Sequence, residues 1–313
     1  MFKVFIDGKA GTTGLRIYDR LKDRDDIELI TLDESVRKDP AARSERINAS
    51  DVTFLCLPDD AAREAVSFVN NDKTIIIDAS TAHRTESGWS YGFAELSEKH
   101  REAIRNGKRI AVPGCHAGGF VALVYPLVKE GVIPTDYPIS CFSITGYSGG
   151  GNKMIADYDT NDDFRLKSPR QYAVGQKHKH LKEMKAITGI DDFPLFSPIV
   201  SGFYSGMEVT VPLMSKLLKD KASPEEIAEI YSRYYNGSEL VRCVGYSPEN
   251  VFLASNELTG KDTMEIGVYG NSDRILLISR FDNLGKGASG AAIQCMNLSL
   301  GLPETAGLVL GHL

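Results

Sequence analysis

The first third of the chain alternates short apolar runs with longer segments of mixed polarity. Apolar side chains recur at helical spacing within two of these segments, residues 15–21 and 60–69. Strands that alternate with helices predict an α/β fold with a doubly wound parallel sheet, whose ligands bind beyond the carboxyl ends of the strands. The predicted strands are 3–7, 27–32, 52–58, 74–80 and 109–112.

The hydrophobic pattern changes from about residue 139 onward. Polar and apolar residues alternate in strand fashion over 138–146, 208–213 and 274–281. Long alternating strands with separated helices predict an α+β domain that has a mixed or antiparallel sheet with helices on one face. Ser223 and Pro224 predict the start of one such helix, because serine caps a helix and proline suits its first turn.

Length and charge exclude several classes of protein. A chain of 313 residues is too long for one small core and suits two domains. The net charge of −6, without a block of Lys or Arg, predicts no nucleic-acid partner. No apolar run approaches the roughly 18 residues of a membrane span, and the amino terminus enters a strand directly. We therefore expect neither a membrane contact nor a signal peptide.

The cysteines indicate a reducing compartment. They are odd in number, widely scattered and without a CxxC pair, so neither a disulfide framework nor a zinc site is expected. We expect a cytoplasmic protein with free thiols and no bound metal. The five are Cys56, Cys115, Cys141, Cys243 and Cys295, and Cys56 lies inside an apolar run that predicts a place in the core.

A glycine-rich turn joins the first strand to the first helix. Gly8, Gly11 and Gly14 enclose Thr12 and Thr13. A strand, a glycine-rich turn and a helix in this order place backbone N–H groups around an anion, usually the pyrophosphate of a dinucleotide. The spacing is GxxGxxG instead of the commoner GxGxxG, and such turns also occur for structural reasons alone. The position between strand and helix favours nucleotide binding.

The residues after the second strand bear on the choice of cofactor. An acid there binds the ribose 2′-hydroxyl of NAD, whereas Arg, Lys and Ser accommodate the 2′-phosphate of NADP. Asp33 and Glu34 precede Ser35 and Arg37. NADP is favoured if Ser35 and Arg37 fold over the phosphate while the acids point away, and a solvated charged loop remains the alternative. Pro58 and Ser80 end later strands at the same cofactor-binding edge of the sheet.

Cys115 lies between a Pro-Gly turn and an apolar helix predicted over 120–128. A thiol at a helix start has a lowered pKa and an exposed sulfur, so Cys115 is a candidate covalent nucleophile. The alternative is a small apolar residue at a tight turn. His116 is adjacent in sequence, but neighbouring side chains at a helix start diverge, so it is not expected to serve the thiol.

His178 and His180 are candidate proton carriers for that thiol. Two histidines without a third ligand make a poor metal site, whereas an imidazole near a thiol can take its proton and later return one. If a helix begins near Lys179, the two rings point in different directions and only one faces the pocket. The polar stretch 161–177 is interpreted as a loop that is either mobile over the site or simply solvated.

The chain resembles the semialdehyde dehydrogenase superfamily, and within it the shorter form of the N-acetyl-gamma-glutamyl-phosphate reductases. The resemblance extends over nearly the whole chain, and the combination of motifs is far more specific than any one of them. The residues that carry it are 8–14, 78–84, 113–115, 148–151, 177–183 and 282–292.

The resemblance implies a division of labour between two domains. Residues 1–114 and 287–313 would form a Rossmann-type dinucleotide-binding domain. Residues 115–286 would form an α+β domain with a mixed sheet for catalysis, substrate binding and assembly of a homo-oligomer, a dimer or a tetramer. The implied reaction is the NADPH-dependent reduction of N-acetylglutamyl 5-phosphate, a small-molecule substrate, through a thioester on Cys115.

The resemblance also implies residue roles. A histidine of the HxH motif would pair with Cys115; we favour His180 as the acid/base, with His178 as the alternative, which would otherwise assist in binding. Among the remaining positions, Asn283 would approach the nicotinamide, Glu183 would orient His180 or bind substrate, and Ser148, Gly149 and Arg84 would bind substrate.

Three other functions remain open. Two belong to the same superfamily: aspartate-semialdehyde dehydrogenase, and a lysine-pathway reductase acting on a carrier-bound substrate. The third is a nucleotide-sensing protein without activity, which the presence of Cys115 and both histidines disfavours, since a sensor needs no nucleophile.

Overall fold

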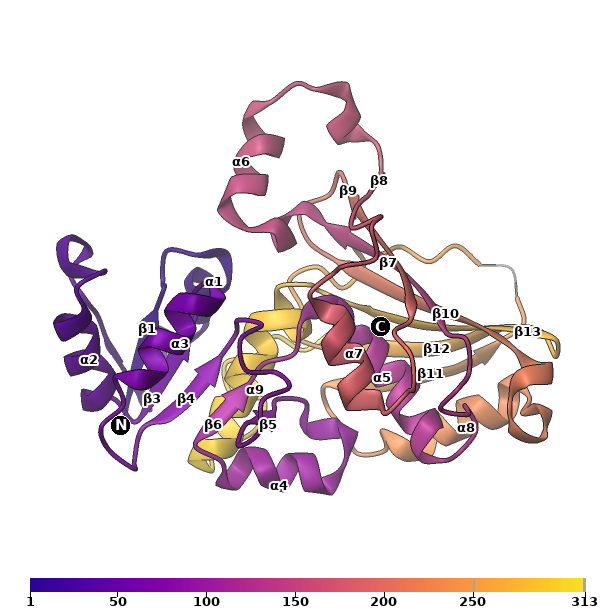
Figure 1. Cartoon of the computed structure of the whole chain (residues 1–313), viewed down its shortest axis with the longest axis horizontal. Helices are drawn as coiled ribbons and strands as arrows, with labels where there is room; N and C mark the ends of the chain where they lie inside the picture. The colour runs from indigo at the N-terminus through magenta and orange to yellow at the C-terminus, as the bar shows by residue number, and fades with distance from the viewer. Residues whose placement is uncertain (250, 312–313) are drawn as a thin grey trace. The chain divides into compact units, whose positions relative to one another are not determined.

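The computed structural model describes residues 1–249 and 251–311 (Figure 1). Within them the chain forms two compact units. The first comprises Met1–Gly114 and Ala288–Leu308, and the second comprises Cys115–Gly287 together with residues 309–311. No helix in the described ranges is both long and apolar enough to cross a bilayer.

The first unit is built on a six-stranded sheet in the order β2-β1-β3-β4-β6-β5, in which every neighbouring pair is parallel. The predicted parallel sheet is therefore confirmed, with strands somewhat shorter than their apolar runs. The strands are β1 (Phe2–Asp7), β2 (Ile27–Ile30), β3 (Val52–Leu55), β4 (Ile75–Asp78), β5 (Ser90–Tyr91) and β6 (Arg109–Ala111).

Helices cover both faces of this sheet. One face packs on side chains of α1 (Thr12–Leu21), α4 (Glu98–Asn106) and α9 (Gly290–Leu300). The other face packs on α2 (Pro40–Ala49) and α3 (Asp59–Ser67). Burial on both faces explains why the central strands are continuous apolar runs instead of alternating ones.

The second unit is built on a seven-stranded mixed sheet in the order β11-β12-β13-β10-β7-β9-β8. Two neighbouring pairs are parallel, β11 with β12 and β7 with β9, and the other neighbouring pairs are antiparallel. This confirms the predicted mixed sheet. The strands are β7 (Ser140–Gly146), β8 (Arg170–Gln171), β9 (Leu195–Ser201), β10 (Met207–Met214), β11 (Val241–Ser247), β12 (Met264–Gly270) and β13 (Arg274–Phe281).

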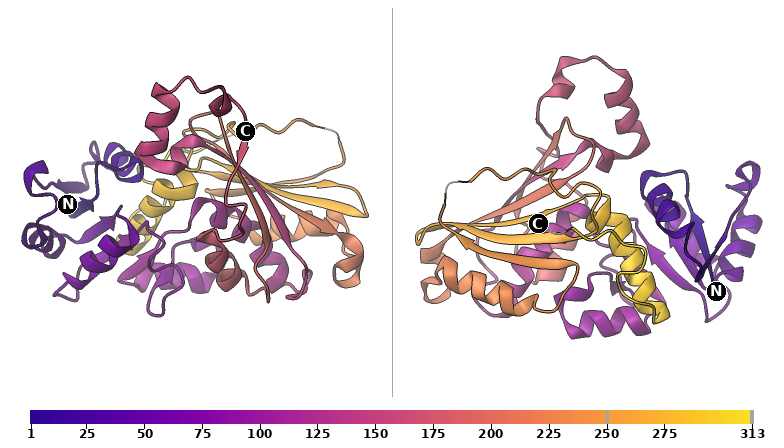
Figure 2. Two further views of the ribbon diagram at one scale, coloured as in Figure 1. Left: turned by 45° about the horizontal axis from the view of Figure 1, so that its top comes forward. Right: turned by 180° about the vertical axis from the view of Figure 1, so that it is seen from behind.

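Three helices lie on the same face of the second sheet: α5 (Cys115–Lys129), α7 (His180–Thr188) and α8 (Pro224–Tyr234) (Figures 1 and 2). α5 lies close against β10 and β13, because a Cβ at Gly119 would come within 2.6 Å of Val209 and 2.8 Å of Phe281. α8 begins with the predicted cap, in which Ser223 accepts a hydrogen bond from the Glu226 N–H and the Glu226 carboxylate accepts one from the Ser223 N–H.

The opposite face of the second sheet carries exposed apolar side chains. They come from five of the strands, and alternate with the residues that pack on the helices. In the described residues they are Phe142, Leu195, Met214, Val244 and Leu276.

An arm projects from the second sheet between β7 and β8 and contains α6 (Gly151–Thr160) (Figures 1 and 2). No residue of α6 is buried, and the ring of Tyr147 stacks on that of Tyr158 with centroids 4.2 Å apart. The prediction that 161–177 is a mobile or solvated loop is only partly right. The stretch contains a 3-10 helix at Phe164–Lys167 and strand β8, and the Gln176 amide makes two hydrogen bonds with the backbone of Phe196.

Two boundaries differ from those expected. α5 begins at Cys115, five residues earlier than predicted, since the small residues of the first turn pack as part of the helix. Residues 309–311 belong to the second unit and not to the first. Val309 exchanges two hydrogen bonds with Asp262, and the Gly311 N–H donates to Thr263 Oγ1.

Candidate active site and cofactor pocket

The glycine-rich turn between β1 and α1 requires its glycines. Gly8 has φ +90°, and a Cβ there would lie 2.3 Å from the carbonyl oxygen of Cys56. A Cβ at Gly14 would lie 2.6 Å from the carbonyl oxygen of Gly8. The turn therefore approaches the end of β3 more closely than any side chain allows. Gly11 caps α1 without a side-chain hydrogen bond, which leaves the first-turn N–H groups facing a potential anion.

A pocket of about 520 Å³ opens beside this turn in the first unit. Its walls combine the glycine turn, apolar side chains that suit an adenine ring, and charged groups from the loop after β2. Lining residues include Gly8, Gly11, Leu29, Leu32, Glu34, Arg37, Lys38, Leu57 and Pro58. A smaller recess of about 170 Å³ is lined by Gly11, Thr12, Thr13, Cys56, Leu57 and Ala79. These features fit a dinucleotide: the close contacts of the glycines, the start of α1 without a side-chain cap, and the apolar walls.

The charged loop after β2 differs from its predicted arrangement. Asp33 accepts hydrogen bonds from both the N–H and the hydroxyl of Ser35, and neither residue lines the pocket. Glu34 forms an ion pair with Arg37, and both line the pocket with Lys38. The expectation that the acids point away is therefore wrong for Glu34. Arg37 and Lys38 are therefore cations at the pocket wall, whereas the Ser35 hydroxyl is already bonded to Asp33.

Cys56 is partly buried against the hydrophobic core and also lines both recesses of the first unit, so its predicted place in the core is confirmed only in part. Burial raises the pKa of its thiol far above the usual range, and the charges of Asp78 and Asp7 raise it further. The residue therefore remains a neutral thiol. Pro58 follows directly and begins the approach to α3.

Ser80 and Arg84 stabilise the loops after β4 and β6. The Ser80 hydroxyl donates to Asp78, whose carboxylate also contacts Nδ1 of His83 at 2.7 Å. Arg84 is buried and donates from Nε to the carbonyl of Val112 and from a terminal nitrogen to that of Ala79. These hydrogen bonds give the buried guanidinium of Arg84 acceptors within the protein, so its burial requires no bound substrate. They also anchor the segment that leads to Cys115.

Cys115 is the first residue of α5 in the second unit and is partly exposed. The thiol thus lies at the positive end of a 15-residue helix dipole, where a negative charge is stabilised. Gly287 lies against it, because a Cβ at Gly287 would come 3.1 Å from the Cβ of Cys115. The glycine-rich 285–290 segment thus keeps the space around the thiol open.

Three imidazole rings gather beside the start of α5. The ring of His116 lies 5.5 Å from that of His178 and 5.5 Å from that of His180, centroid to centroid. Phe196 contacts His116 and His178 through ring edges, at 5.4 and 5.2 Å. His178 and His180 thus both place their rings beside that of His116, where we expected the two side chains to point in different directions. Which of the three rings faces the Cys115 thiol stays a prediction.

His116 is held by two hydroxyl groups. Its Nδ1 lies 2.6 Å from the Ser143 hydroxyl, and its Nε2 lies 2.6 Å from that of Tyr172. Only 3% of the residue is exposed, and burial lowers its pKa to about 3, with a further contribution from the nearby His178. His116 is therefore neutral at any working pH. It links the two hydroxyl groups through hydrogen bonds and does not act as a charged acid.

α7 begins where the sequence predicts, and it fixes the orientation of His178. The backbone N–H of His180 donates to Nδ1 of His178 at 3.1 Å, so the imidazole caps the start of the helix. An Nδ1 that accepts a hydrogen bond leaves the proton of the neutral ring on Nε2. His180 and Glu183 are both buried on the same face of α7, three residues apart.

Asn283, Ser148 and Gly149 form a second constellation in this unit. The Asn283 amide nitrogen donates to the Ser148 hydroxyl at 3.0 Å, and its oxygen accepts the N–H of Gly206 at 2.9 Å. A Cβ at Gly149 would lie 3.3 Å from the same amide nitrogen. Asn283 thus ties the residues after β7 and β13 to one another, while its predicted contact with a nicotinamide stays a prediction.

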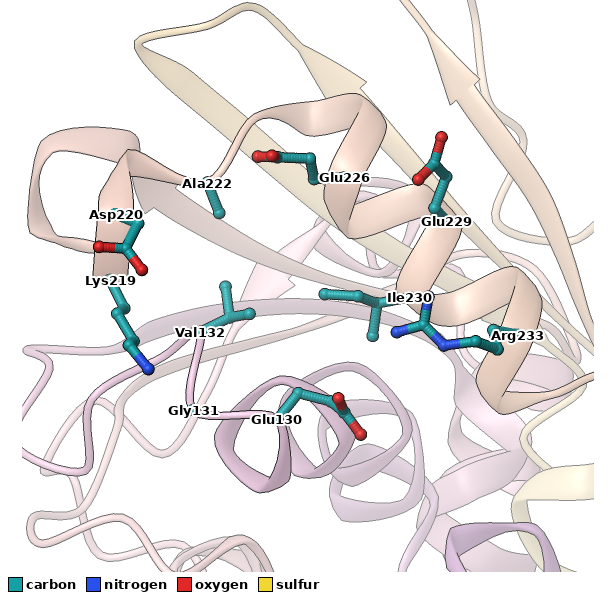
Figure 3. Close-up of a pocket in the computed structure, with 10 residues that line it drawn as sticks. All are labelled: Glu130, Gly131, Val132, Lys219, Asp220, Ala222, Glu226, Glu229, Ile230 and Arg233. Carbon is teal, nitrogen blue, oxygen red and sulfur yellow. The ribbon is translucent and has the colours of Figure 1, made fainter.

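A further pocket of about 350 Å³ lies at the other end of α5 (Figure 3). Its lining mixes acids and bases, among them Glu130, Lys219, Asp220, Glu229 and Arg233. Fourteen residues separate Cys115 from Lys129 at the two ends of α5, a distance of about 20 Å. This pocket is therefore separate from the Cys115 site. Among residues 1–249 and 251–311, no three His, Cys, Asp or Glu side chains are arranged to hold a metal ion.

Two family models match consecutive parts of the chain. "Semialdehyde dehydrogenase, NAD binding domain" matches residues 33–106, and "Semialdehyde dehydrogenase, dimerisation domain" matches residues 115–283. A Nostoc sp. protein called N-acetyl-gamma-glutamyl-phosphate reductase 2 is 45% identical, over 98% of this chain and 99% of its own length. The Burkholderia ambifaria protein called N-acetyl-gamma-glutamyl-phosphate reductase is 41% identical over 96% of each chain. The chain belongs to the N-acetyl-gamma-glutamyl-phosphate reductase family. This confirms the family resemblance predicted from its sequence motifs.

Solved structures with the same fold are more distant in sequence. Aspartate semialdehyde dehydrogenase from Francisella tularensis has a TM-score of 0.72 at 16% identity, over 95% of this chain and 99% of its own. The enzyme from Candida albicans, described with NADP, has a TM-score of 0.65 at 15% identity, over 95% and 98%. At these identities the likeness establishes the fold alone, and the fold is that of the semialdehyde dehydrogenases.

Sequence reasoning missed three residues that contact the imidazole cluster, namely Ser143, Tyr172 and Phe196. They come from β7, from the residue after β8, and from β9. Ser143 is buried where an alternating strand usually carries an apolar side chain, which is a detectable signal. Tyr172 had no such signal, because its place depends on the pairing of β8 with β9.

Proposed function

We propose that this chain is an NADPH-dependent reductase that converts N-acetyl-L-glutamyl 5-phosphate into N-acetyl-L-glutamate 5-semialdehyde and phosphate. The names of relatives that are 40–45% identical over nearly the whole chain support the substrate. One structural observation supports the chemistry: a cysteine at the start of α5 beside a cluster of three imidazoles.

Cys115 is the proposed nucleophile. Its thiolate attacks the acyl carbon, the bond from that carbon to the phosphate oxygen breaks, and a thioester remains on the sulfur. A thioester accepts hydride far more readily than a carboxylate does, so the covalent step makes the reduction feasible. The open space beside Gly287 leaves room for the acyl group.

His180 is the proposed acid/base. It donates a proton to the oxygen of the thiohemiacetal and takes one back as that adduct collapses to aldehyde and thiolate. His178 is less suited to this exchange, because protonation of its Nδ1 would break the hydrogen bond with the N–H of His180 that caps α7. Glu183, buried on the same helix face, is proposed to orient His180 or to bind substrate.

NADPH, when bound, supplies the hydride. Gly8, Gly11, Gly14 and the first turn of α1, with Thr12 and Thr13, would hold its pyrophosphate. Arg37 and Lys38 would meet the 2′-phosphate, and Pro58 would border the bound cofactor. Ser35, Ser80 and Asn283 are retained as predicted cofactor contacts, and Ser148, Gly149 and Arg84 as predicted substrate contacts. Of these, Arg84 has the weakest support, since its guanidinium already bonds two backbone carbonyls.

A homodimer is proposed through the open face of the second sheet. The matched family description is a dimerisation domain, and exposed Phe142, Leu195 and Leu276 give this face apolar area to bury. Phe142→Glu combined with Leu276→Glu should yield a monomer in analytical ultracentrifugation. An unchanged sedimentation coefficient would exclude this interface.

The substrate assignment is tested in the reverse direction. The enzyme is supplied with phosphate, NADP or NAD, and either N-acetylglutamate semialdehyde or aspartate semialdehyde. NADPH formation should be fastest with the N-acetylated semialdehyde and NADP. Faster turnover of aspartate semialdehyde would assign the chain to the rival activity, and no turnover with either would favour a sensor.

A further inference from the structure

We propose that Tyr172 is a catalytic residue of this site, donating a hydrogen bond to the sulfur of Cys115 and then to the oxygen of the bound acyl group. The hydrogen bond to the acyl oxygen rests on the proposed function, whereas the hydrogen bond to the Cys115 sulfur concerns the enzyme without substrate. His116 and Ser143 are positioning residues that hold the Tyr172 hydroxyl.

Backbone and side-chain contacts anchor Tyr172 at the start of α5. Its N–H donates to the carbonyl of Pro198 on β9, and its hydroxyl lies 2.6 Å from Nε2 of His116, the residue next to Cys115. Two residues around it, Ala173 and Gln176, have φ values of +50° and +55°, which non-glycine residues rarely adopt. The Gln176 amide holds this kinked segment on Phe196 through two hydrogen bonds. A strained segment that is fixed this firmly is typical of a functional site.

One of the two directions open to this hydrogen-bond chain suits donation to sulfur. His116 is neutral, so only one of its nitrogens carries a proton. If the Ser143 hydroxyl donates to Nδ1, then Nε2–H donates to the Tyr172 oxygen, and the Tyr172 proton points onward to a third acceptor. Ser143 lies wholly inside the protein, with its hydroxyl 2.6 Å from Nδ1.

The charge of Cys115 reaches the Tyr172 hydroxyl. Burial raises the pKa of Tyr172 far above its usual value, and the negative charge of a Cys115 thiolate raises it further. Tyr172 therefore keeps its proton throughout the reaction and offers it only as a hydrogen bond, while His180 carries the proton that moves. A hydrogen bond to the thiolate favours the charged form and lowers the pKa of the thiol.

Other ionisable groups also surround the start of α5. α7 brings His180 and Glu183, and His178 lies two residues before that helix. The segment before α9 brings Lys286 next to Gly287. Their charges influence the thiol as well, so the contribution of Tyr172 is measured as a difference between variants that leave them in place.

The test measures the pKa of Cys115 in the enzyme without substrate. Iodoacetamide is added across pH 5–10, and the Cys115 peptide is quantified by mass spectrometry, which separates it from the other four cysteines. Tyr172→Phe should raise the apparent pKa by about one unit and slow alkylation at neutral pH about tenfold. The matched control is Tyr158→Phe, which removes a hydroxyl from the projecting arm and should leave the profile unchanged.

Variants of the positioning residue provide a second measurement. His116→Gln keeps a donor near the place of Nε2 and should move the pKa less than His116→Ala does. Identical profiles for wild type, Tyr172→Phe and His116→Ala would overturn the proposal, and so would equal shifts in Tyr172→Phe and Tyr158→Phe. Because no substrate is present, the outcome does not depend on the semialdehyde assay. An enzyme that prefers another semialdehyde but shows the pKa shift would contradict the proposed function alone.

Discussion

His180 donates its backbone N–H to Nδ1 of His178, and the two rings lie with centroids 4.7 Å apart. The His178 ring is thus bonded to the start of α7, and this hydrogen bond is what separates it from His180 in the proposed mechanism. Proximity alone does not separate their roles, because both rings are equally distant from His116.

We expect His180→Asn to lower kcat by roughly a hundredfold or more, as the loss of a general acid/base does. His178→Asn should lower kcat less and instead destabilise α7, by about 1 kcal/mol for a lost cap. Steady-state kinetics and urea unfolding of both variants check this. If His178→Asn alone abolishes turnover, the roles are reversed.

His116 should make the fold sensitive to acid. Its pKa in the folded state is about 3, below the value of 6.5 of an unburied histidine, so protonation favours the unfolded chain. The stability that His116 contributes is complete above pH 6.5 and is lost as the pH falls from 6.5 toward 3. Over that range the slope is at most about 1.4 kcal/mol per pH unit for one proton.

In urea titrations between pH 7 and pH 4, His116→Gln should lose less stability than the wild type. It is expected to start from a lower value at pH 7, since the Ser143 and Tyr172 contacts change. Parallel pH curves for the two proteins would mean that His116 is not the residue being protonated.

Gly8→Ala should abolish binding of NADP and destabilise the first unit. The new Cβ would lie 2.3 Å from a backbone oxygen at φ +90°, so the end of β3 must move. Gly131→Ala is the control, because Gly131 also has positive φ (+72°) but no atom lies within 4 Å of its Cβ position. Gly131→Ala should lower the free energy of unfolding only by the strain of a left-handed non-glycine residue, about 1–2 kcal/mol. Equal losses of stability and of NADP affinity in both variants would contradict the close approach.

Arg37→Ala should raise the KM for NADPH about ten- to a hundredfold and leave the KM for NADH unchanged, because a charge-assisted contact with the 2′-phosphate contributes roughly 1.5–3 kcal/mol. Arg105→Ala removes a comparable surface arginine, ion-paired with Glu102 on α4, and controls for nonspecific effects. A similar change in KM for both cofactors would place the 2′-phosphate elsewhere.

The sequence predicted the parts of the fold that depend on local pattern. β1, the glycine turn and α1 follow from a short apolar run and its glycines, and the cap at Ser223 from two residues. β11 and β12 were missed. A register shift between Cys243 and Gly245 interrupts β11, and β12 is buried along most of its length, so neither alternates cleanly.

Motifs in the sequence led to Cys115 and the two histidines as candidates, whereas residues brought in by tertiary packing were missed. The structure places the two histidine rings side by side, and their roles stay a prediction. His116 was rejected because neighbouring side chains diverge on a helix, yet β7 and the segment after β8 fold onto α5 and enclose its ring. The pairing of Glu34 with Arg37 is a local contact, and only the structure shows that both line the pocket.

The central claim is that Cys115 carries the substrate as a thioester, and a burst experiment without phosphate tests it most directly. N-acetylglutamate semialdehyde and NADP are mixed with the enzyme, and NADPH is followed by absorbance. We expect a rapid burst of one NADPH per Cys115 that stops until phosphate is added, with an N-acetylglutamyl adduct on the Cys115 peptide. Cys115→Ser should bind NADP but give neither burst nor adduct. Continuous NADPH formation without an adduct, or a burst from Cys115→Ser, would contradict the account.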